Sequence, residues 1–130
     1  MKHTILSICL ATLMLTTFIS CKKNGIGGDN TIAAFPKHHS KTISNAIVYI
    51  KYGATEFPGD DISVYDDSEV AEQEGTGDAH AHFTGLLKGD YFIYAVGYDS
   101  AISQTVKGGI KVKITTKAGE QDIEIPVTES

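Results

Sequence analysis

Apolar and polar residues alternate in short segments along most of this chain, with turn-forming residues between the segments. The strongest segments are residues 46–52 and 90–97, which are rich in β-branched and aromatic side chains. Gly108 and Gly109 predict a turn between two later segments, and no helical periodicity persists for long. The predicted strands are residues 32–38, 46–52, 79–83, 90–97, 102–106, 110–115 and 121–127.

Seven short strands at this spacing predict an all-β fold, a seven-stranded antiparallel sandwich. A parallel sheet would need long crossover connections, usually helices, and the chain has no room for them. We therefore expect residues 31–130 to form a single β-sandwich domain.

The period of two also predicts which side chains face the core. Alternate residues of a strand point to opposite faces, so Ala79, Ala81 and Phe83 should share one face. The inward residues predicted on two further strands are Ala46, Val48, Ile50, Tyr91, Ile93 and Ala95. The outward aromatic and histidine side chains are Tyr49, His80, His82, Phe92 and Tyr94. If their strands are neighbours, these five form an exposed binding face. The alternative is that residues 53–77 fold over this face and cover it.

The first twenty residues differ from the rest and predict a signal peptide, which takes no part in the fold. Lys2 provides a positive start, and the apolar run of residues 5–18 is too short to span a bilayer comfortably. The run Phe18-Ile19-Ser20-Cys21 resembles the bacterial lipobox, whose cysteine is acylated and becomes the new N-terminus. This resemblance implies a lipid anchor at Cys21 that holds the protein on a bilayer. The alternative is an ordinary secretory signal whose cleavage site falls beside a cysteine.

Cysteine count and charge limit the kinds of cross-link, metal site and partner that we expect for this chain. Cys9 leaves with the leader, so the mature chain keeps only Cys21 and forms no disulfide or cysteine metal site. Without Lys2, ten lysines face sixteen acidic residues, a side-chain charge of −6. The chain has no arginine, which argues against nucleic-acid recognition.

The residues after Cys21 bear on position in the cell. Residues 21–30 are polar and glycine-rich, and they predict a flexible tether. Lys22 stands where an aspartate would resemble an inner-membrane retention signal, so the outer membrane is favoured. The acidic export signal typical of surface lipoproteins is absent from residues 22–25, which favours the periplasmic side.

One internal stretch carries a family resemblance. Residues 77–95, with Ala81, Phe83, Leu86, Gly89, Tyr91 and Ala95 at matching positions, resemble carboxypeptidase regulatory-like and Cna-B-like domains. Residues 43–50 are similar to the second strand of those domains, without its proline and glycine. The resemblance implies a prealbumin-like, transthyretin-type Greek-key sandwich over residues 31–128. Its motifs are core and turn residues, so they specify architecture rather than activity.

Enzyme chemistry finds no support in the sequence. Transthyretin-like hydrolases of that fold use an arginine and a terminal Tyr-Arg-Gly-Ser motif, whereas this chain has no arginine and ends in Val127-Thr128-Glu129-Ser130. Nucleophile-elbow, zinc-protease and phosphate-loop motifs are also absent. We therefore expect a protein that is not an enzyme.

Two clusters are candidates for metal binding. His80 and His82 project to the same side of a strand, a spacing that can chelate a divalent transition metal such as zinc. The third ligand would be His38, His39 or an acid, although adjacent residues such as His38 and His39 are expected on opposite faces. Nine acidic residues between positions 53 and 78 could bind calcium, but they lack the EF-hand spacing. The alternatives are surface histidines without metal and a solvated, mobile acidic loop.

The sequence therefore predicts a lipid-anchored protein of the cell envelope with a non-catalytic sandwich that binds or assembles with an envelope protein or glycan. Two other functions stay open. One is a divalent-metal protein that uses His80 and His82, and the other is a structural spacer without a specific ligand.

Overall fold

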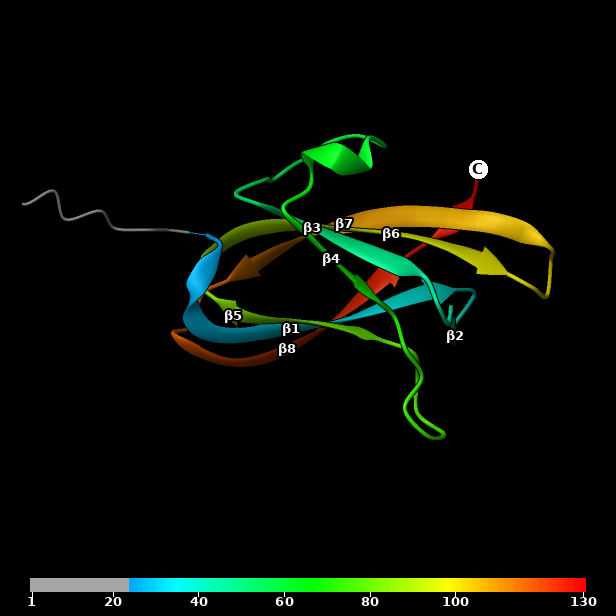
Figure 1. Ribbon diagram of the computed structural model, residues 1–130, viewed down its shortest axis with the longest axis horizontal. Coiled ribbons are helices and arrows are strands. Elements are labelled where there is room, and N and C mark those ends of the chain that lie inside the picture. Colours follow the sequence, from blue (N-terminus) through cyan, green and yellow to red (C-terminus); the bar gives the residue numbers. More distant parts are fainter. Residues whose placement is uncertain (1–23) are drawn as a thin grey trace, which may run out of the picture.

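The alternating segments form the strands of two β-sheets that lie face to face in the computed structural model (Figure 1). The structure describes residues 24–130, so the leader and Cys21 lie outside the described residues. The strands are β1 (Ile26–His38), β2 (Lys41–Thr42), β3 (Ile47–Tyr52), β4 (Asp67–Val70), β5 (Ala81–Leu86), β6 (Gly89–Asp99), β7 (Gln104–Ile114), β8 (Ala118–Pro126) and β9 (Thr128–Glu129). A short 3-10 helix, η1 (Ile62–Val64), lies between β3 and β4.

The first sheet is built around β1. Strand β5 pairs with β1 in antiparallel orientation, β8 pairs with β1 in parallel orientation, and β2 pairs with its last two residues. The second sheet has the order β4-β3-β6-β7-β9, and all of its pairs are antiparallel. Figure 1 shows the two sheets as layers, with β3, β6 and β7 over β1, β5 and β8.

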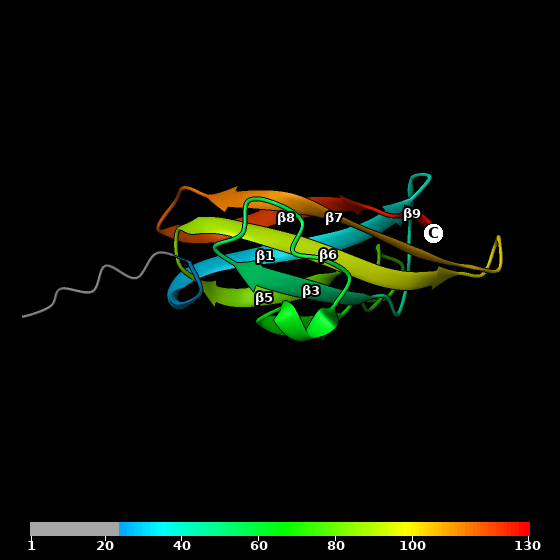
Figure 2. The same cartoon turned by 90° about the horizontal axis from the view of Figure 1, so that it is seen from above.

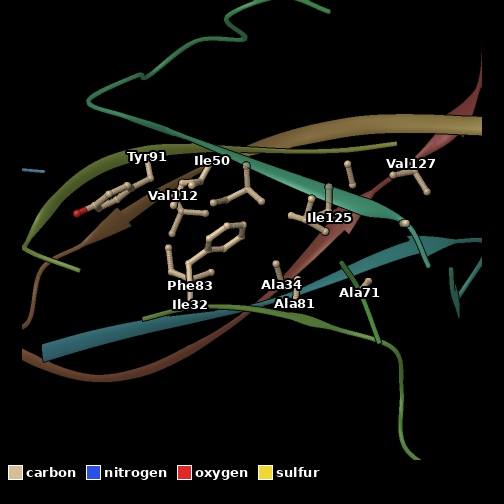
Figure 3. Close-up of a cluster of buried hydrophobic side chains, with 14 of the residues drawn as sticks. Ile32, Ala34, Ile50, Ala71, Ala81, Phe83, Tyr91, Val112, Ile125 and Val127 are labelled. Atoms are coloured by element: carbon tan, nitrogen blue, oxygen red, sulfur yellow. The ribbon is translucent and has the colours of Figure 1, made fainter. Parts of the chain in front are cut away.

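The core fills the space between the layers, and it confirms the predicted inward faces (Figure 3). The nine residues predicted to face inward on β3, β5 and β6 and just before them are all buried: Ala46, Val48, Ile50, Ala79, Ala81, Phe83, Tyr91, Ile93 and Ala95. Each fully buried aliphatic or aromatic side chain contributes roughly 1.5–3 kcal/mol relative to an exposed one. The all-β sandwich is therefore confirmed.

The predicted turn at Gly108 and Gly109 is wrong. Both glycines lie in the middle of β7, which runs without interruption and pairs with β6 along its whole length. A Cβ on Gly108 would lie 2.0 Å from the carbonyl oxygen of Pro126, where the chain passes from β8 in one sheet to β9 in the other. The glycine is needed for this close approach of two backbones, and not for a turn.

The expectation of a purely antiparallel sandwich is also wrong in one place. Strands β1 and β8 pair in parallel from Asp29↔Ala118 to Lys37↔Pro126. No crossover helix is needed, because the rest of the sandwich lies between these two strands in the chain and serves as their connection. The described residues also form more strands than the predicted seven, since short strands β2, β4 and β9 extend the sheets.

The domain begins earlier than predicted. The prediction of a flexible tether over residues 21–30 is therefore wrong for residues 24–30, the part that the structure describes. Strand β1 starts at Ile26, and Asn30 is 2% exposed. The Asn30 Nδ2 group donates to the carbonyl oxygens of Leu86 and Thr116 at 3.2 and 2.9 Å. These bonds hold a glycine-rich, polar segment in the sheet where composition alone predicts a flexible chain.

Within residues 24–130, none of the helical structure is long and apolar enough to cross a bilayer.

Candidate functional site

The predicted aromatic binding face is covered. Phe92 and Tyr94 lie on the outer face of the second sheet, yet they are 8% and 3% exposed. Residues 53–66, the covering loop, fold over them, with the Phe57 ring centroid 5.3 Å from that of Tyr94. The Tyr65 ring stacks on Tyr94 at 5.6 Å. The alternative in which residues 53–77 cover this face is thus confirmed for residues 53–66, and the exposed patch is wrong.

Asp60 fastens the covering loop to the sheet. The Tyr94 hydroxyl donates to Asp60 Oδ1 at 2.7 Å, and Lys107 Nζ donates to the same oxygen at 3.2 Å. These hydrogen bonds, that from Tyr94 first, lower the pKa of Asp60 below its ordinary value of 3.8. Burial raises the pKa of Tyr94 and brings that of Tyr65 to about 12. The loop is therefore held through an ionised carboxylate and neutral phenols near neutral pH.

The covering loop should open in acid. A carboxyl group whose pKa is lowered in the closed state stabilises that state above its ordinary pKa of 3.8, and loses this contribution as the pH falls through the lowered value. We expect residues 54–65 to lose protection from amide hydrogen exchange, measured relative to the intrinsic rates at each pH, as the pH is lowered stepwise from 6 to values below 3.8. Asp60→Asn should open the loop at pH 6 as well.

The matched control is Glu56→Gln, which changes an exposed acid of the same loop. In this variant the amide hydrogen-exchange rates of residues 54–65 should equal those of the unchanged protein at the same pH. Equal protection in the Asp60→Asn and Glu56→Gln variants at pH 6 would show that Asp60 does not fasten the loop.

His80 and His82 lie on the opposite side of the molecule from Tyr49 and Tyr94. They flank Ala81 on the outer face of the first sheet, because β5 pairs with β1, whereas β3 and β6 belong to the second sheet. The five residues predicted to form one binding face are therefore divided between two outer faces, and the single face is wrong.

The His80 and His82 rings contact each other edge to face, with centroids 4.6 Å apart. His80 also stacks on Phe35 at 4.9 Å, and its Nδ1 lies 2.8 Å from the Asp78 carbonyl oxygen. His82 Nε2 lies 4.0 Å from a carboxylate oxygen of Glu120. Among residues 24–130, no group of three ligand atoms within 4.8 Å of one another includes His80 or His82, or lies in the acidic stretch 53–78.

His38 and His39 form a cluster with two carboxylates, those of Asp99 and Glu129. The sequence pattern does not identify these two carboxylates as part of a site. His38 is the last residue of β1 and is 3% exposed, and its Nδ1 lies 2.7 Å from Asp99 Oδ2 at the end of β6. Its Nε2 lies 3.2 Å from Glu129 Oε2 on β9. The His39 ring centroid is 4.1 Å from that of His38. The expectation that His38 and His39 point apart is thus wrong.

The reason is the hairpin between β1 and β2. His38 pairs with Lys41, and the two residues between them, His39 and Ser40, have φ of 49° and 71°. The period of two holds only for extended chain, so it fails where the backbone turns with positive φ. The turn folds the His39 ring back against His38.

His38 and its two carboxylate partners shift one another's pKa values. The hydrogen bond to Asp99 raises the pKa of His38 above its ordinary 6.5, although burial opposes the rise. The same bond is the main cause that lowers the pKa of Asp99, whose other oxygen accepts from the Ala101 N–H at 2.9 Å. The pKa of Glu129 is lowered by its own backbone N–H and then by His38. The cluster is a buried imidazole held between two ionised carboxylates.

Asp99 and Glu129 could not be found from the sequence, because they lie on strands far from His38 in the chain and belong to no motif. The one local hint in the sequence is the His-His-Ser run before Lys41. A two-residue turn usually takes asparagine or glycine, so histidine and serine there are unusual.

Comparison of the chain with protein-family models, curated proteins and solved structures finds no match.

Proposed function

We propose that this protein is a lipoprotein of the cell envelope, anchored through acylated Cys21, whose non-catalytic β-sandwich binds or assembles with an envelope protein or glycan. The observation that carries the proposal is the position of Asn24. This residue is fixed to one end of the sandwich and follows Cys21 by only three positions.

Hydrogen bonds fix this end of the chain. The Asn24 N–H donates to the Lys88 carbonyl oxygen at 2.9 Å, and Asn24 Oδ1 accepts from the Asp90 N–H at 2.6 Å. The Gly25 N–H donates to the buried Tyr91 hydroxyl at 2.8 Å. Three residues of extended chain reach about 10 Å, so a lipid on Cys21 would place this end of the sandwich next to the headgroups.

The charge of this end suits such a position. Lys88, Lys113 and Lys117 are exposed and line one hollow of about 610 Å³ together with Asn24. Lys22 and Lys23 precede them in the chain. Each lysine close to an anionic bilayer contributes about 1 kcal/mol to membrane binding, although the whole chain is acidic. The lysines thus support the lipid anchor, which would leave the opposite end of the sandwich pointing away from the bilayer.

We further propose the prealbumin-like Greek-key architecture of carboxypeptidase regulatory-like and Cna-B-like domains for this sandwich. The burial of Ala81, Phe83 and Tyr91, which occupy core positions of the resembling stretch, supports this assignment. For the location we propose the periplasmic side of the outer membrane, on the basis of residues 22–25.

Replacement of Cys21 tests the anchor. In cells that express the full chain, Cys21→Ser should abolish incorporation of radiolabelled palmitate and shift the protein from the membrane to the soluble fraction, because the acylated thiol is gone. Cys9→Ser is the matched control, since Cys9 lies in the leader. It should leave both readouts unchanged.

The proposal would be overturned if the Cys21→Ser protein still incorporated palmitate and stayed in the membrane fraction.

Protease treatment of intact cells tests which side of the membrane holds the protein. For the periplasmic face we expect resistance to the protease that disappears when the cells are lysed. An affinity purification from envelope extract that enriches no protein or glycan would favour the spacer over the binding module.

A further inference from the structure

We propose that His38, His39 and Glu129 form a zinc site at the end of the sandwich remote from Asn24. A ring nitrogen of each histidine and a carboxylate oxygen of Glu129 lie within 4.8 Å of one another. Two imidazoles and a carboxylate suit Zn²⁺, which takes three protein ligands and a water in its open sites. This site is independent of the lipid anchor and differs from the His80 and His82 pair.

Asp99 prepares His38 for this role. Metal-bound histidines commonly donate their second ring N–H to a carboxylate, which fixes the ring and its tautomer. The Nδ1 of His38 lies 2.7 Å from Asp99 Oδ2, and both side chains are buried. With the Nδ1 proton donated to Asp99, the Nε2 lone pair of His38 is directed toward Glu129.

The distance between His38 and Glu129 fits a shared cation. A lone pair and a carboxylate oxygen repel each other, so a proton or a cation must lie between them. Tetrahedral zinc with bonds of about 2.0–2.1 Å spaces its ligand atoms by about 3.3 Å. The separation of His38 Nε2 and Glu129 Oε2 is 3.2 Å.

The backbone of His39 gives an independent indication. Its φ is 49°, and the following Ser40 has a φ of 71°. A two-residue turn of this kind favours Asn-Gly, so Ser40 stands where glycine is usual and makes the turn less stable than one with the usual residues. Less favourable backbone conformations of this kind occur preferentially at functional sites. At this position the turn places the His39 imidazole against His38.

The remaining ligands can adjust and are open to solvent. His39 is exposed and the Glu129 side chain is 43% exposed, so small rotations can complete the coordination. A groove of about 670 Å³ leads to both residues and to His38. Strand β1 separates this site from Asn24 by 13 residues of extended chain, roughly 40 Å. Figure 2 shows the C-terminus beside β9 at this far end.

The test is a metal titration of the full-length protein, purified in detergent and treated with a chelator that is then removed. Zn²⁺ is added against a chromogenic competitor, Co²⁺ is added to record its visible spectrum, and Ca²⁺ is added separately. We expect one equivalent of zinc, the intense visible absorption of tetrahedral cobalt, and no calcium binding at equal concentration, because imidazole ligands disfavour calcium.

Two variants remove one ligand each. His39→Asn suits the left-handed turn and should preserve or raise the melting temperature of the metal-free protein, but it should weaken zinc binding by about tenfold or more. Glu129→Gln should weaken it similarly, because an amide oxygen is a poor zinc ligand. His82→Ala is the matched control and should bind zinc with unchanged affinity.

Three results would overturn the proposal. They are no stoichiometric zinc on the unchanged protein, equal affinity of the folded His39→Asn variant, or loss of binding in His82→Ala alone. The last would assign the metal to His80 and His82 instead.

Discussion

Replacing Gly108 with alanine is expected to destabilise the sandwich by about 3 kcal/mol or more. The added Cβ would lie 2.0 Å from the Pro126 carbonyl oxygen and 3.0 Å from the Val127 Cα. Both are backbone atoms, so no side-chain rotation relieves the clash, and the link from β8 to β9 must move. For a domain of this size we expect the melting temperature to fall by more than about 10 °C.

Gly77→Ala is the control for this substitution. Gly77 lies in the exposed connection before β5, and the nearest atom to its added Cβ is the Glu74 carbonyl oxygen at 3.2 Å. Its effect should stay within about 0.5 kcal/mol. If the two variants melted at the same temperature, the close approach of β7 to the β8–β9 link would be refuted.

Replacing Phe83 with alanine is expected to cost about 3–5 kcal/mol, because it removes a large side chain from the core and leaves a cavity. Phe83 is 3% exposed and belongs to the cluster between the two sheets (Figure 3). In urea unfolding the midpoint should fall while the slope stays unchanged, since the surface exposed on unfolding is nearly the same.

The preceding residue provides the control. His82 points to the other side of β5, and its side chain is 41% exposed. His82→Ala should change stability by no more than about 0.5 kcal/mol. Equal losses in Phe83→Ala and His82→Ala would contradict the alternation that orients β5.

Much of the fold followed from local pattern. The alternation in residues 79–83 and 90–97 predicted the buried positions, because a strand that covers a core on one face must repeat every two residues. The pattern misplaced Gly108 and Gly109, because glycine marks both turns and close backbone contacts. It also missed the early start of β1, whose polar residues are stabilised by hydrogen bonds from Asn30.

The candidate site was less accessible to sequence reasoning. The sequence marks His38 and His39 as potential ligands but not their partners Asp99 and Glu129, because no motif links residues separated by 61 and 91 positions. The pairing of β1 with β8 and of β7 with β9 brings these residues together. His80 and His82 were the more obvious pair, yet no third ligand within residues 24–130 joins them.

The sequence by itself determined which segments are extended and which side chains face inward, because both depend on neighbours one or two positions away. Only the tertiary structure decided which sheet each strand joins. That choice separated His82 from Tyr94 on opposite outer faces, covered Tyr94 with residues 53–66, and joined His38 to Asp99 and Glu129. The physical reason is that alternation sets the orientation of a side chain within its strand, whereas strand partners are selected by pairing and packing over the whole chain.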